Sequence, residues 1–594
     1  MITYSSMLKQ QIAQLVEQSL TRAFPDHQEV IQERKIIIEY PKDATHGDYA
    51  CNIALQLAKP LGMPPRQVAE RLVEFMSGSD FIQTMEIAGP GFINFYVSVP
   101  YLVGNMRGIL DRTDAYGTHK KGENQRILVE YSSPNTNKPL HLGHARNNFL
   151  GMAAANLLAA NGYEVIKTQI INDRGIHICK SMAAYETYGR DTSPESLDKK
   201  SDHFVGDYYV KYAQNEEELK DRAVEMLQMW EASDSDVREL WAKMNEWVLS
   251  GFTQTYQAIG SHFDFVTFES DISEGGRALV EAAVDAGKAE KIEGGALAIN
   301  LADAGLGDSE TGYKVLVRSD GTTIYMTQDL QLAVHRMEGD SPAKHVDQLI
   351  YVVGNEQDYH FKVLFEVLKR FGYDWADQLH HLSYGMVELP SGKMKSREGT
   401  TVDMDNLLAE IESLVDAEIT TRDLPYEGKQ RTDLTRIIAL GALKYYMLRV
   451  DAKSNMLYDP ASSIDFQGNT GPYLQYTHAR IRSILRKSTI SAEELHNAAV
   501  DPSDLSQPEE IMLLRKLALY PETIHNALDG YRIHQIAHTL HDLAQAFNVF
   551  YSQHSVLDAP TPEIKTARLQ LITAVAQVLK NGLAILGIDA PERM

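Results

Sequence analysis

The chain has 594 residues, with 57 Lys and Arg against 81 Asp and Glu, which gives a formal net charge of −24. Its length predicts several domains, and 44% hydrophobic with 23% charged residues excludes wholesale disorder and fibrous repeats. The two cysteines, Cys51 and Cys179, exclude a disulfide framework and a cysteine-rich metal site, and they favour a cytoplasmic protein. Neither a signal peptide nor a membrane-spanning segment is predicted.

The acidic excess is concentrated in one stretch of the chain. Residues 190–310 contain 11 basic and 26 acidic side chains, a net of −15, whereas residues 437–594 contain 14 and 16. We interpret the acidic stretch as solvated faces of helices. The total of −24 taken alone argues against a polyanionic partner, because phosphate binding uses Lys and Arg. The uneven distribution weakens that argument for the rest of the chain.

The two ends of the chain predict two domains of different class. Residues 1–118 combine three amphipathic helical patterns with strand patterns in RKIIIEY and TMEIAGPGFINFYVS, which predicts an α+β domain. From residue 431 to 594 strand signals vanish and helical periodicity dominates, as in IHQIAHTLHDLAQAFNVFYS. This segment therefore predicts an all-α helical bundle.

The middle of the chain, residues 119–430, alternates between strands and helices. RILVEYSS predicts a buried strand, GHARNNFLGMAAANLLAANG a helix, and YEVIKTQIIND the next strand, which together form a βαβ unit. The alternation resumes in YKVLVRSDGTTIYMTQD, DQLIYVVGN and LHHLSYGMVEL. We predict an α/β Rossmann-type domain with a parallel sheet, split at about 190–310 by the acidic, mainly helical insertion.

A first candidate site lies in SSPNTNKPLHLGHARNNF, between the first of these strands and its helix. A loop at the carboxyl end of a parallel strand that leads into a helix N-terminus is a place where nucleotide phosphates bind. His141, His144 and Lys138 offer hydrogen-bond donors to a polyphosphate, and Gly143 permits close approach. The alternative is a histidine pair that only stabilises the turn.

A second candidate site lies in GMVELPSGKMKSREGT, which also follows a predicted strand. Lys393, Lys395 and Arg397 make this loop basic, and cations beside a polyphosphate stabilise charge on its leaving group. Taken alone, the loop also fits an ordinary solvated segment.

In this order, the two loops resemble the H-I-G-H and K-M-S-K-S signatures of class I aminoacyl-tRNA synthetases. VEYSSPNTNKPLHLGH, NDRG, TGPYLQYTHARIRSI, the terminal LGIDAPERM, HGDYACNIA and GPGFINFYVS narrow the resemblance to the arginyl-tRNA synthetase family, over essentially the whole chain. The resemblance implies an arginine–tRNA ligase. Such an enzyme activates L-arginine with ATP, releases pyrophosphate, and transfers the arginyl group to the terminal ribose of tRNA(Arg).

The resemblance also assigns roles at the two loops. His141 and His144 would contact the ATP phosphates, and Gly143 would let the adenosine pack against the backbone. The second signature departs from the family pattern, because Ser396 stands where many class I enzymes have a lysine. The resemblance implies that Lys138 substitutes for it, so we expect Lys138 and Lys393 to be the leading catalytic cations, with Lys395 and Arg397 also binding ATP. We expect Mg²⁺ to be bound by ATP and water, with no metal held by the protein.

A guanidinium group is always charged and presents a planar fork of donors, so its pocket requires carboxylates and amide oxygens. The positions that match the family's arginine-binding residues are Glu130 and Asn135 toward the backbone end of the substrate, and Tyr325, Asp329 and Gln357 toward its side chain. The alternative is that Tyr325 belongs to the core and Asp329 caps the following helix.

In the C-terminal segment, TGPYLQYTHARIRSILRK interleaves aromatic with basic residues. The resemblance makes this bundle the anticodon-binding domain, and it makes the N-terminal domain a contact for the outer corner of the tRNA. Tyr476 and Arg480 are the candidates for contact with tRNA, whereas aromatic residues at helical spacing also fit a core. We expect the tRNA to lie away from residues 190–310, and the family is usually monomeric.

Three other functions fit parts of the pattern. A class I synthetase for another amino acid would share both signatures, but the guanidinium-suited residues and NDRG argue against it. A small-molecule nucleotidyltransferase needs neither the helical C-terminal segment nor the separate N-terminal domain. A non-enzymatic RNA-binding paralogue is disfavoured because Lys138, His141, Gly143, His144 and Asp329 are intact.

Overall fold

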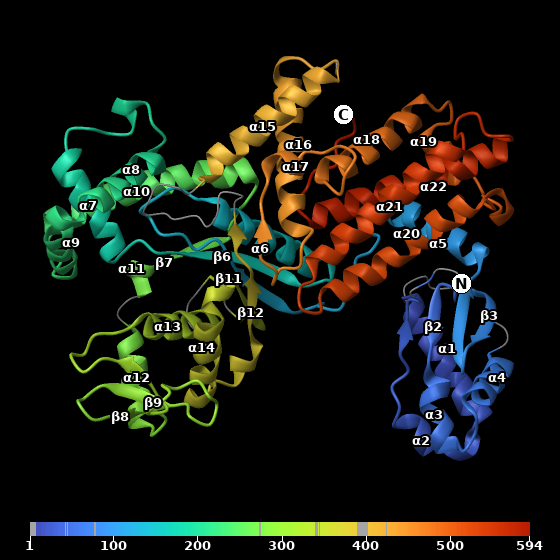
Figure 1. Cartoon of the computed structure of the whole chain (residues 1–594), viewed down its shortest axis with the longest axis horizontal. Coiled ribbons are helices and arrows are strands. Elements are labelled where there is room, and N and C mark those ends of the chain that lie inside the picture. The colour runs from blue at the N-terminus through green and yellow to red at the C-terminus, as the bar shows by residue number, and fades with distance from the viewer. Residues whose placement is uncertain are drawn as a thin grey trace.

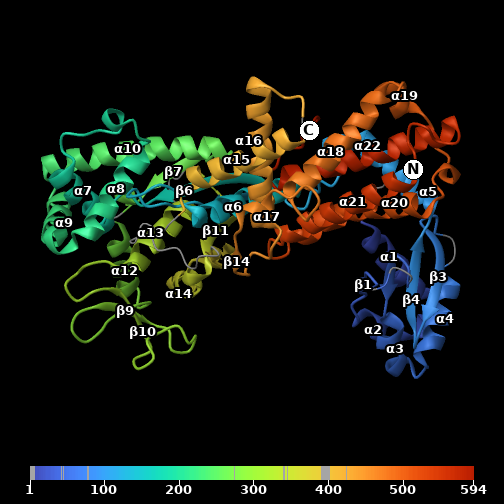
Figure 2. The same cartoon turned by 45° about the horizontal axis from the view of Figure 1, so that its top comes forward.

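The computed structural model has three visibly different parts (Figure 1). The mixed region with a central sheet lies on the left in Figures 1 and 2, the helical bundle lies on the right, and the α+β body of the N-terminal residues lies below the bundle. The structure describes the chain apart from residues 1–6, 42, 44–45, 77–78, 273–274, 339–341, 344, 389–401 and 423.

The N-terminal body is a four-stranded antiparallel sheet, in the order β1-β2-β4-β3, with helices packed on it. Leu8, Ile12, Val16 and Leu20 recur every four residues on α1, so one face of this helix is buried. The predicted α+β character is confirmed. The elements are α1 (Leu8–Ala23), α2 (Gln28–Gln32), β1 (Ile38–Glu39), β2 (Tyr49–Cys51), α3 (Ile53–Leu61), α4 (Pro65–Phe75), β3 (Ile82–Ala88) and β4 (Phe92–Val97).

α5 (Val99–Arg112) follows this body and packs against the C-terminal helices α20 (Pro508–Ala527) and α22 (Pro562–Ile585). The turn after it passes close to α20: Gly117 has a φ of +87°, and a β-carbon there would lie 2.3 Å from the ring of Tyr520. Glycine is therefore required both by the backbone conformation and by the space.

A five-stranded parallel sheet forms the centre of the second part, in the order β12-β11-β5-β6-β7. The chain adds strands on one side of β5 and later returns to add β11 and β12 on its other side. The strand order therefore reverses between β5 and β11, which is where ligands bind in open α/β sheets. The elements are β5 (Arg126–Glu130), α6 (Leu142–Ala160), β6 (Glu164–Ile171), β7 (Phe265–Phe268), α13 (Tyr325–Glu338), β11 (Gln348–Gly354), α14 (Asp358–Phe371) and β12 (Leu379–Tyr384).

The range 190–310 is less uniform than the sequence pattern indicates. Its first half is helical, as predicted, but β7 within it is an edge strand of the parallel sheet. The predicted strand YKVLV forms β10 of a separate antiparallel sheet, in the order β10-β9-β8. Strand periodicity identifies a strand but not the sheet to which it belongs. The elements are α7 (Ile176–Tyr188), α8 (Ser201–Gln214), α9 (Glu216–Glu231), α10 (Ser235–Ile259), α11 (Glu269–Ile272), α12 (Gly275–Asp285), β8 (Glu290–Lys291), β9 (Leu297–Asn300) and β10 (Tyr313–Val317).

The C-terminal part is a bundle, and its helical character is confirmed. α22 lies among α5, α18 and α21, and buried side chains cover most of its circumference, as expected for a central helix. The short strand β13 (Val387–Glu388), which precedes α15, pairs in parallel with β14 (Met456–Leu457), which follows α16. The helices are α15 (Met404–Thr421), α16 (Gly428–Leu448), α17 (Pro460–Ser463), α18 (Gly471–Lys487), α19 (Ala492–Asn497), α20, α21 (Ile533–Gln553) and α22.

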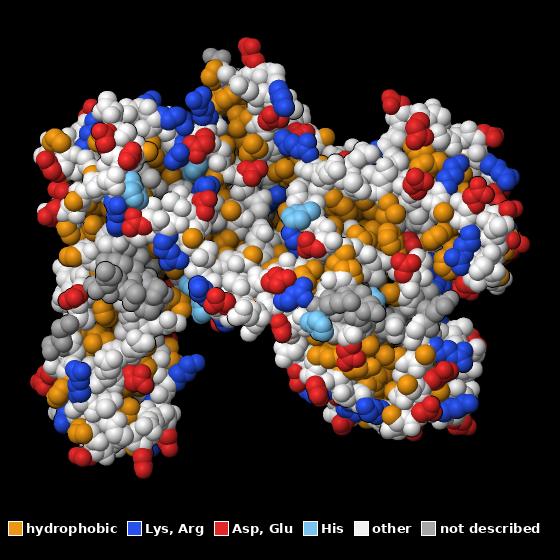
Figure 3. Space-filling view, turned by 180° about the vertical axis from the view of Figure 1, so that it is seen from behind, with side chains coloured by type: hydrophobic (Ala, Val, Ile, Leu, Met, Phe, Trp, Pro, Cys, Tyr) orange, Lys and Arg blue, Asp and Glu red, His pale blue; other side chains and the backbone are white. Residues whose placement is uncertain are grey.

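The surface carries charges of both signs. On the face seen in Figure 3, Lys and Arg side chains are interspersed with Asp and Glu side chains over both ends of the molecule. Across the described part of the chain, helices that combine the length and the apolarity needed to cross a membrane are absent.

Candidate active site

The residues of the first signature lie beside the point where the strand order reverses. The loop from Tyr131 to His141 leaves the carboxyl end of β5 and leads into α6, while Gln357 follows the carboxyl end of β11 next to it. The parallel pairing of β5 and β11 therefore brings two segments that are more than 200 residues apart to one edge of the sheet. This is the position at which the sequence placed the phosphate site.

His141 and His144 form a reciprocal cap at the start of α6. The Gly143 amide donates to His141 Nδ1 at 3.2 Å, and the His141 amide donates to His144 Nδ1 at 3.1 Å. Because each Nδ1 accepts a hydrogen bond from a backbone amide, each neutral imidazole carries its proton on Nε2. Each ring can therefore donate a hydrogen bond from Nε2. The two ring centroids are 4.0 Å apart. The pair thus stabilises the turn and still keeps one donor on each ring for a ligand.

Lys138 lies close enough to both imidazoles to lower their pKa values. Burial takes the pKa of His141 to about 3, and the Lys138 ammonium lowers it too. Burial and the same ammonium hold the pKa of His144 well below its ordinary value. Burial also lowers the pKa of Lys138. Both rings are therefore neutral donors at neutral pH, grouped with one amine at the N-terminus of a helix. We call Lys138, His141 and His144 the phosphate corner.

The start of α15 lies directly against the start of α6. The Leu142 amide donates to the Val402 carbonyl at 3.0 Å, and the Met404 amide donates to the Leu140 carbonyl at 2.9 Å. His141 and Asp403 are opposite each other in this short antiparallel bridge. The second signature immediately precedes Val402 in the sequence, but Lys393, Lys395 and Arg397 lie outside the described residues.

A cavity of about 660 Å³ opens beside the carboxyl ends of β5, β6 and β7. It is lined by Asn135 after β5, by Glu269 after β7, and by Tyr325 at the start of α13. Asn135 is fixed by a bridge to Asn172, and the Tyr325 side chain is 74% exposed. Two of the predicted arginine-binding residues thus share one cavity. Because Tyr325 is so exposed, it does not belong to the hydrophobic core.

Glu269 is a residue that sequence reasoning missed. Burial raises its pKa to about 7, with smaller contributions from the carboxylates of Asp173 and Asp329, while Arg174 and a hydrogen bond from Gln328 act in the opposite direction. A nearby cation would favour its charged form. The signal that could have found it is its position directly after FVTF, had that segment been read as a strand of the parallel sheet.

Asp329 of α13 and Gln357, just before α14, are not among the residues that line this cavity. Asp329 of α13 accepts from His360 Nε2 of α14 at 2.6 Å. Gln357 is exposed at the residue before α14, three positions from His360. Asp329 acts electrostatically on Glu269, which lines the cavity. A contact of Asp329 or Gln357 with arginine therefore stays a prediction.

Glu130 has a partner inside the protein. It is buried at the end of β5 and forms an ion pair with Arg336 of α13, whose side chain is fully buried. Burial lowers the pKa of Arg336 to about 10. A guanidinium already contacts this carboxylate, so the structure shows Glu130 as a structural partner of Arg336. A contact between Glu130 and substrate stays a prediction.

Within the described residues, a single group of three carboxylate and imidazole side chains lies close enough to share an ion. It consists of Asp202, His203 and Asp405, whose ligand atoms lie within 4.8 Å of one another. Lys200 Nζ lies 3.1 Å from Asp202 Oδ2 and 2.6 Å from Asp405 Oδ2. This ammonium occupies the position of a counter-cation, so the donor set fits an ion-pair cluster and does not fit Mg²⁺, which needs near-ideal octahedral oxygen ligands.

Tyr476 and Arg480 are both half-buried on α18. The Arg480 guanidinium lies 4.6 Å from the centroid of the Tyr476 ring and donates to its hydroxyl at 3.0 Å. Arg480 also donates to Asn548 of α21 at 3.0 Å. The two side chains are therefore ordered at the surface of the bundle, and their contact with RNA stays a prediction.

Three segments of the chain match known protein families. The description "tRNA synthetases class I (R), catalytic domain" matches residues 105–459, "Arginyl tRNA synthetase N terminal domain" matches residues 10–97, and "DALR anticodon binding domain" matches residues 474–594. Together with the parallel sheet and the site at its carboxyl ends, the first match defines a class I tRNA synthetase.

Individual relatives narrow this class to one family. Proteins named arginine–tRNA ligase from Bacteroides fragilis and Flavobacterium psychrophilum are 42% and 44% identical to the chain; the alignments cover 89% and 85% of it, and 91% and 85% of the relatives. The solved structure of Thermus thermophilus arginyl-tRNA synthetase matches with a TM-score of 0.81 at 25% identity, covering 99% of this chain and 100% of that one. The chain belongs to the arginyl-tRNA synthetase family.

Proposed function

We propose that this chain is an arginine–tRNA ligase. It activates L-arginine with ATP to arginyl-adenylate and then transfers the arginyl group to tRNA(Arg) for protein synthesis. The observation that carries the proposal is the meeting of two unlike regions at one edge of the sheet: the phosphate corner, which is rich in donors, and the cavity that contains the Glu269 carboxyl. A polyphosphate suits the first region and a guanidinium suits the second.

In the activation step, a carboxylate oxygen of arginine attacks the α-phosphorus of ATP, and the bond from that phosphorus to the bridging oxygen breaks to release pyrophosphate. This reaction needs positioning and charge stabilisation more than covalent help from side chains. His141 and His144 donate from Nε2, and Lys138 from Nζ, to the phosphate oxygens as negative charge develops on the leaving group. Lys393 provides a further cation, with Lys395 and Arg397 beside it.

Magnesium enters with the nucleotide. When bound, Mg²⁺ neutralises phosphate charge, and we propose that ATP oxygens and water are its ligands because the described acidic cluster already holds Lys200. The protein side of the step is therefore carried by the phosphate corner and by the lysines and arginine of the second signature.

The residues at and around the cavity that contains Glu269 select arginine. Asp329, Tyr325 and Gln357 bind the guanidinium end of the substrate, with Glu269 as an additional carboxyl, while Asn135 and Glu130 contact its backbone end. A buried or half-buried carboxylate binds a guanidinium favourably, because the two groups can form two parallel hydrogen bonds. Neutral amino acids leave these carboxylates unpaired, which is costly.

In the transfer step, the 2′-hydroxyl of the terminal ribose attacks the arginyl carbonyl carbon, and AMP leaves. The helical bundle binds the anticodon region, with Tyr476 and Arg480 among its contacts, and the N-terminal body meets the outer corner of the tRNA. We further propose that the enzyme acts as a monomer in the cytoplasm, a reducing compartment that suits its two free, buried cysteines.

One assay separates this function from the alternatives. ATP–pyrophosphate exchange is measured with each of the twenty amino acids, with and without tRNA. We expect exchange that is specific for arginine and that depends strongly on tRNA. Exchange with a different amino acid indicates another synthetase, exchange with a non-amino-acid carboxylate indicates a small-molecule adenylating enzyme, and complete inactivity together with tRNA binding indicates a non-catalytic paralogue.

A further inference from the structure

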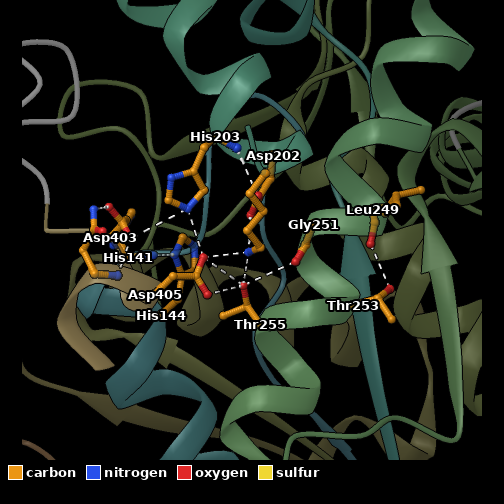
Figure 4. Close-up of polar contacts among 12 residues, drawn as sticks. His141, His144, Asp202, His203, Leu249, Gly251, Thr253, Thr255, Asp403 and Asp405 are labelled. Atoms are coloured by element: carbon orange, nitrogen blue, oxygen red, sulfur yellow. Dashed lines mark hydrogen bonds and ion pairs between the residues drawn. The ribbon is translucent and has the colours of Figure 1, made fainter. Parts of the chain in front are cut away.

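Four side chains form a compact cluster beside the phosphate corner (Figure 4). Asp405, near the start of α15, lies at its centre. Lys200 Nζ donates to Asp405 Oδ2 at 2.6 Å, His203 Nε2 lies 3.0 Å from the same oxygen, and the Thr255 hydroxyl lies 3.0 Å from Asp405 Oδ1. We call Lys200, His203, Thr255 and Asp405 the Asp405 anchor. Its members come from the start of α8, from α10 and from α15.

Two helices of the acidic stretch hold the anchor in place. Asp202 of α8 has a completely buried side chain and lies 3.1 Å from Lys200 Nζ. Opposite it, a β-carbon at Gly251 of α10 would lie 2.3 Å from the Asp202 carboxyl carbon. Because glycine lets α10 approach this closely, α8 and α10 pack against each other at the cluster and present Lys200 and Thr255 to Asp405 together.

The anchor is charged at neutral pH. Burial alone would raise the pKa of Asp405, but the hydrogen bonds from His203 and Lys200 outweigh burial and lower it to about 2. The hydrogen bond to Asp405 raises the pKa of His203, and burial opposes this shift. Asp405 is therefore ionised at neutral pH, with the Lys200 and His203 nitrogens within hydrogen-bond distance of its carboxylate.

Asp405 is attached to the segment that touches the active site. Two residues before it, Asp403 caps α15 by accepting from the Asn406 amide at 2.8 Å, and Asp403 stands opposite His141 in the bridge between the two helix starts. The Met404 amide of the same segment donates to Leu140. A displacement of Asp405 would therefore also shift His141, because the backbone hydrogen bonds between the two helix starts connect them.

α10 also contacts the other side of the site. Tyr256, the residue after Thr255, lies 2.7 Å from the Ser132 hydroxyl and donates to Gln169 at 2.8 Å. Ser132 belongs to the loop that carries the first signature, and its φ of +75° is unusual for a residue with a side chain. Consecutive residues of one helix thus contact both the loop before α6 and the start of α15.

From these contacts we propose that Lys200, His203 and Thr255 are positioning residues for the activation step. Through Asp405 they hold the start of α15 against the start of α6, and they thereby set the direction in which His141 and His144 present their Nε2 donors. This inference rests on the proposed function and gives α8 and α10 a part in catalysis although neither contributes a residue to the phosphate corner. Supporting side chains of this kind are what fix a site to sub-ångström tolerance.

Lys200→Met tests the anchor, and Lys199→Met is its matched control, because the neighbouring Lys199 pairs with Asp207 on α8 and not with Asp405. Hydrogen exchange at the Leu142 and Met404 amides is expected to accelerate about fivefold or more in Lys200→Met and to stay unchanged in Lys199→Met. In the same protein, kcat for arginine-dependent pyrophosphate exchange falls about tenfold or more, since a displacement of 1 Å can cost that much. The arginine Kd stays within about twofold, and Lys200→Arg restores kcat.

The anchor is overturned by unchanged amide exchange in Lys200→Met, or by accelerated exchange with an unchanged kcat. A loss of arginine affinity as large as the loss of kcat also overturns it, because it indicates general disruption of the domain. Failure of the proposed function has a different signature, namely a wild-type protein that exchanges no pyrophosphate with arginine. In that case the catalytic part of the inference fails too, while the amide exchange still decides whether the anchor holds the two helix starts together.

Discussion

The phosphate corner and the cavity lined by Asn135, Glu269 and Tyr325 lie at one edge of the same sheet but are built in opposite ways. In the corner, both imidazoles are engaged by backbone amides, and burial holds their pKa values low. In the cavity, the Tyr325 side chain is 74% exposed and the Glu269 carboxyl has a pKa near 7. We therefore expect the corner to be organised before substrate arrives and the Glu269 carboxyl to become fully ionised only when a cation binds.

The largest loss of activity is expected when the amine is removed from the phosphate corner. Lys138→Met should lower the rate of arginine-dependent pyrophosphate exchange by about 100-fold or more, as expected for loss of a cation that stabilises the leaving group. Arginine affinity, measured by calorimetry, should stay unchanged, because the cavity is a separate region. Near wild-type exchange in this variant would remove Lys138 from the catalytic machinery.

The next largest effect is expected at the cavity. Asp329→Ala should raise the arginine KM about 30-fold, or ~2 kcal/mol, less than for a fully buried partner because Asp329 is half-exposed. Asp377→Ala is the matched control, since that carboxylate pairs with Lys369 at the surface of the same domain. Equal arginine KM values for the two variants would exclude Asp329 from the pocket.

A third test uses the charge of Glu269. Because its pKa is about 7, the carboxyl is roughly half protonated in the free enzyme at neutral pH, and a bound guanidinium favours the ionised form. Arginine binding should therefore release a fraction of a proton at pH 7 and tighten by up to about tenfold between pH 6 and pH 8. Calorimetry in buffers of different ionisation enthalpy measures the proton. In Glu269→Gln both effects should vanish, and their persistence would assign them to another group.

The smallest effect is expected far from the sheet. Arg480→Ala should raise the KM for tRNA about threefold and reduce its salt dependence by about one phosphate contact, without changing the arginine KM. Arg482→Ala on the same helix is the control, because Arg482 pairs with Glu592. If tRNA binding responds only to the Arg482 change, the predicted surface is misplaced along α18.

Local signals explain what could be predicted from the sequence. A buried strand followed by a loop and a helix is recognisable over some 35 residues, so the position of Lys138, His141 and His144 at a strand end followed from RILVEYSS and the helix after it. The helical bundle followed from periodicity in the same way. The domain limits at 118 and 430 stay predictions, since helices such as α5 pack across them.

Long-range pairing explains what could not be predicted. FVTF becomes the edge strand β7 only because it pairs with β6, about 100 residues earlier, so Glu269 was missed together with its strand. Lys200 and Asp405 are 205 residues apart, and no sequence motif around either residue predicts its contact with the other. The buried ion pair of Glu130 with Arg336 of α13 was not predicted either, and a contact of Glu130 with substrate stays a prediction. Such contacts are decided by tertiary packing and leave no local pattern.

The most direct measurement is an experimental structure of the protein with L-arginine and a non-hydrolysable ATP analogue. We expect phosphate oxygens within hydrogen-bond distance of His141 and His144 Nε2, and the guanidinium of arginine in the cavity that Asn135, Glu269 and Tyr325 line, next to Asp329. The two ligands should meet at the carboxyl end of β5. A nucleotide bound away from α6, or an arginine bound outside that cavity, would contradict the division of the site into a phosphate corner and an arginine cavity.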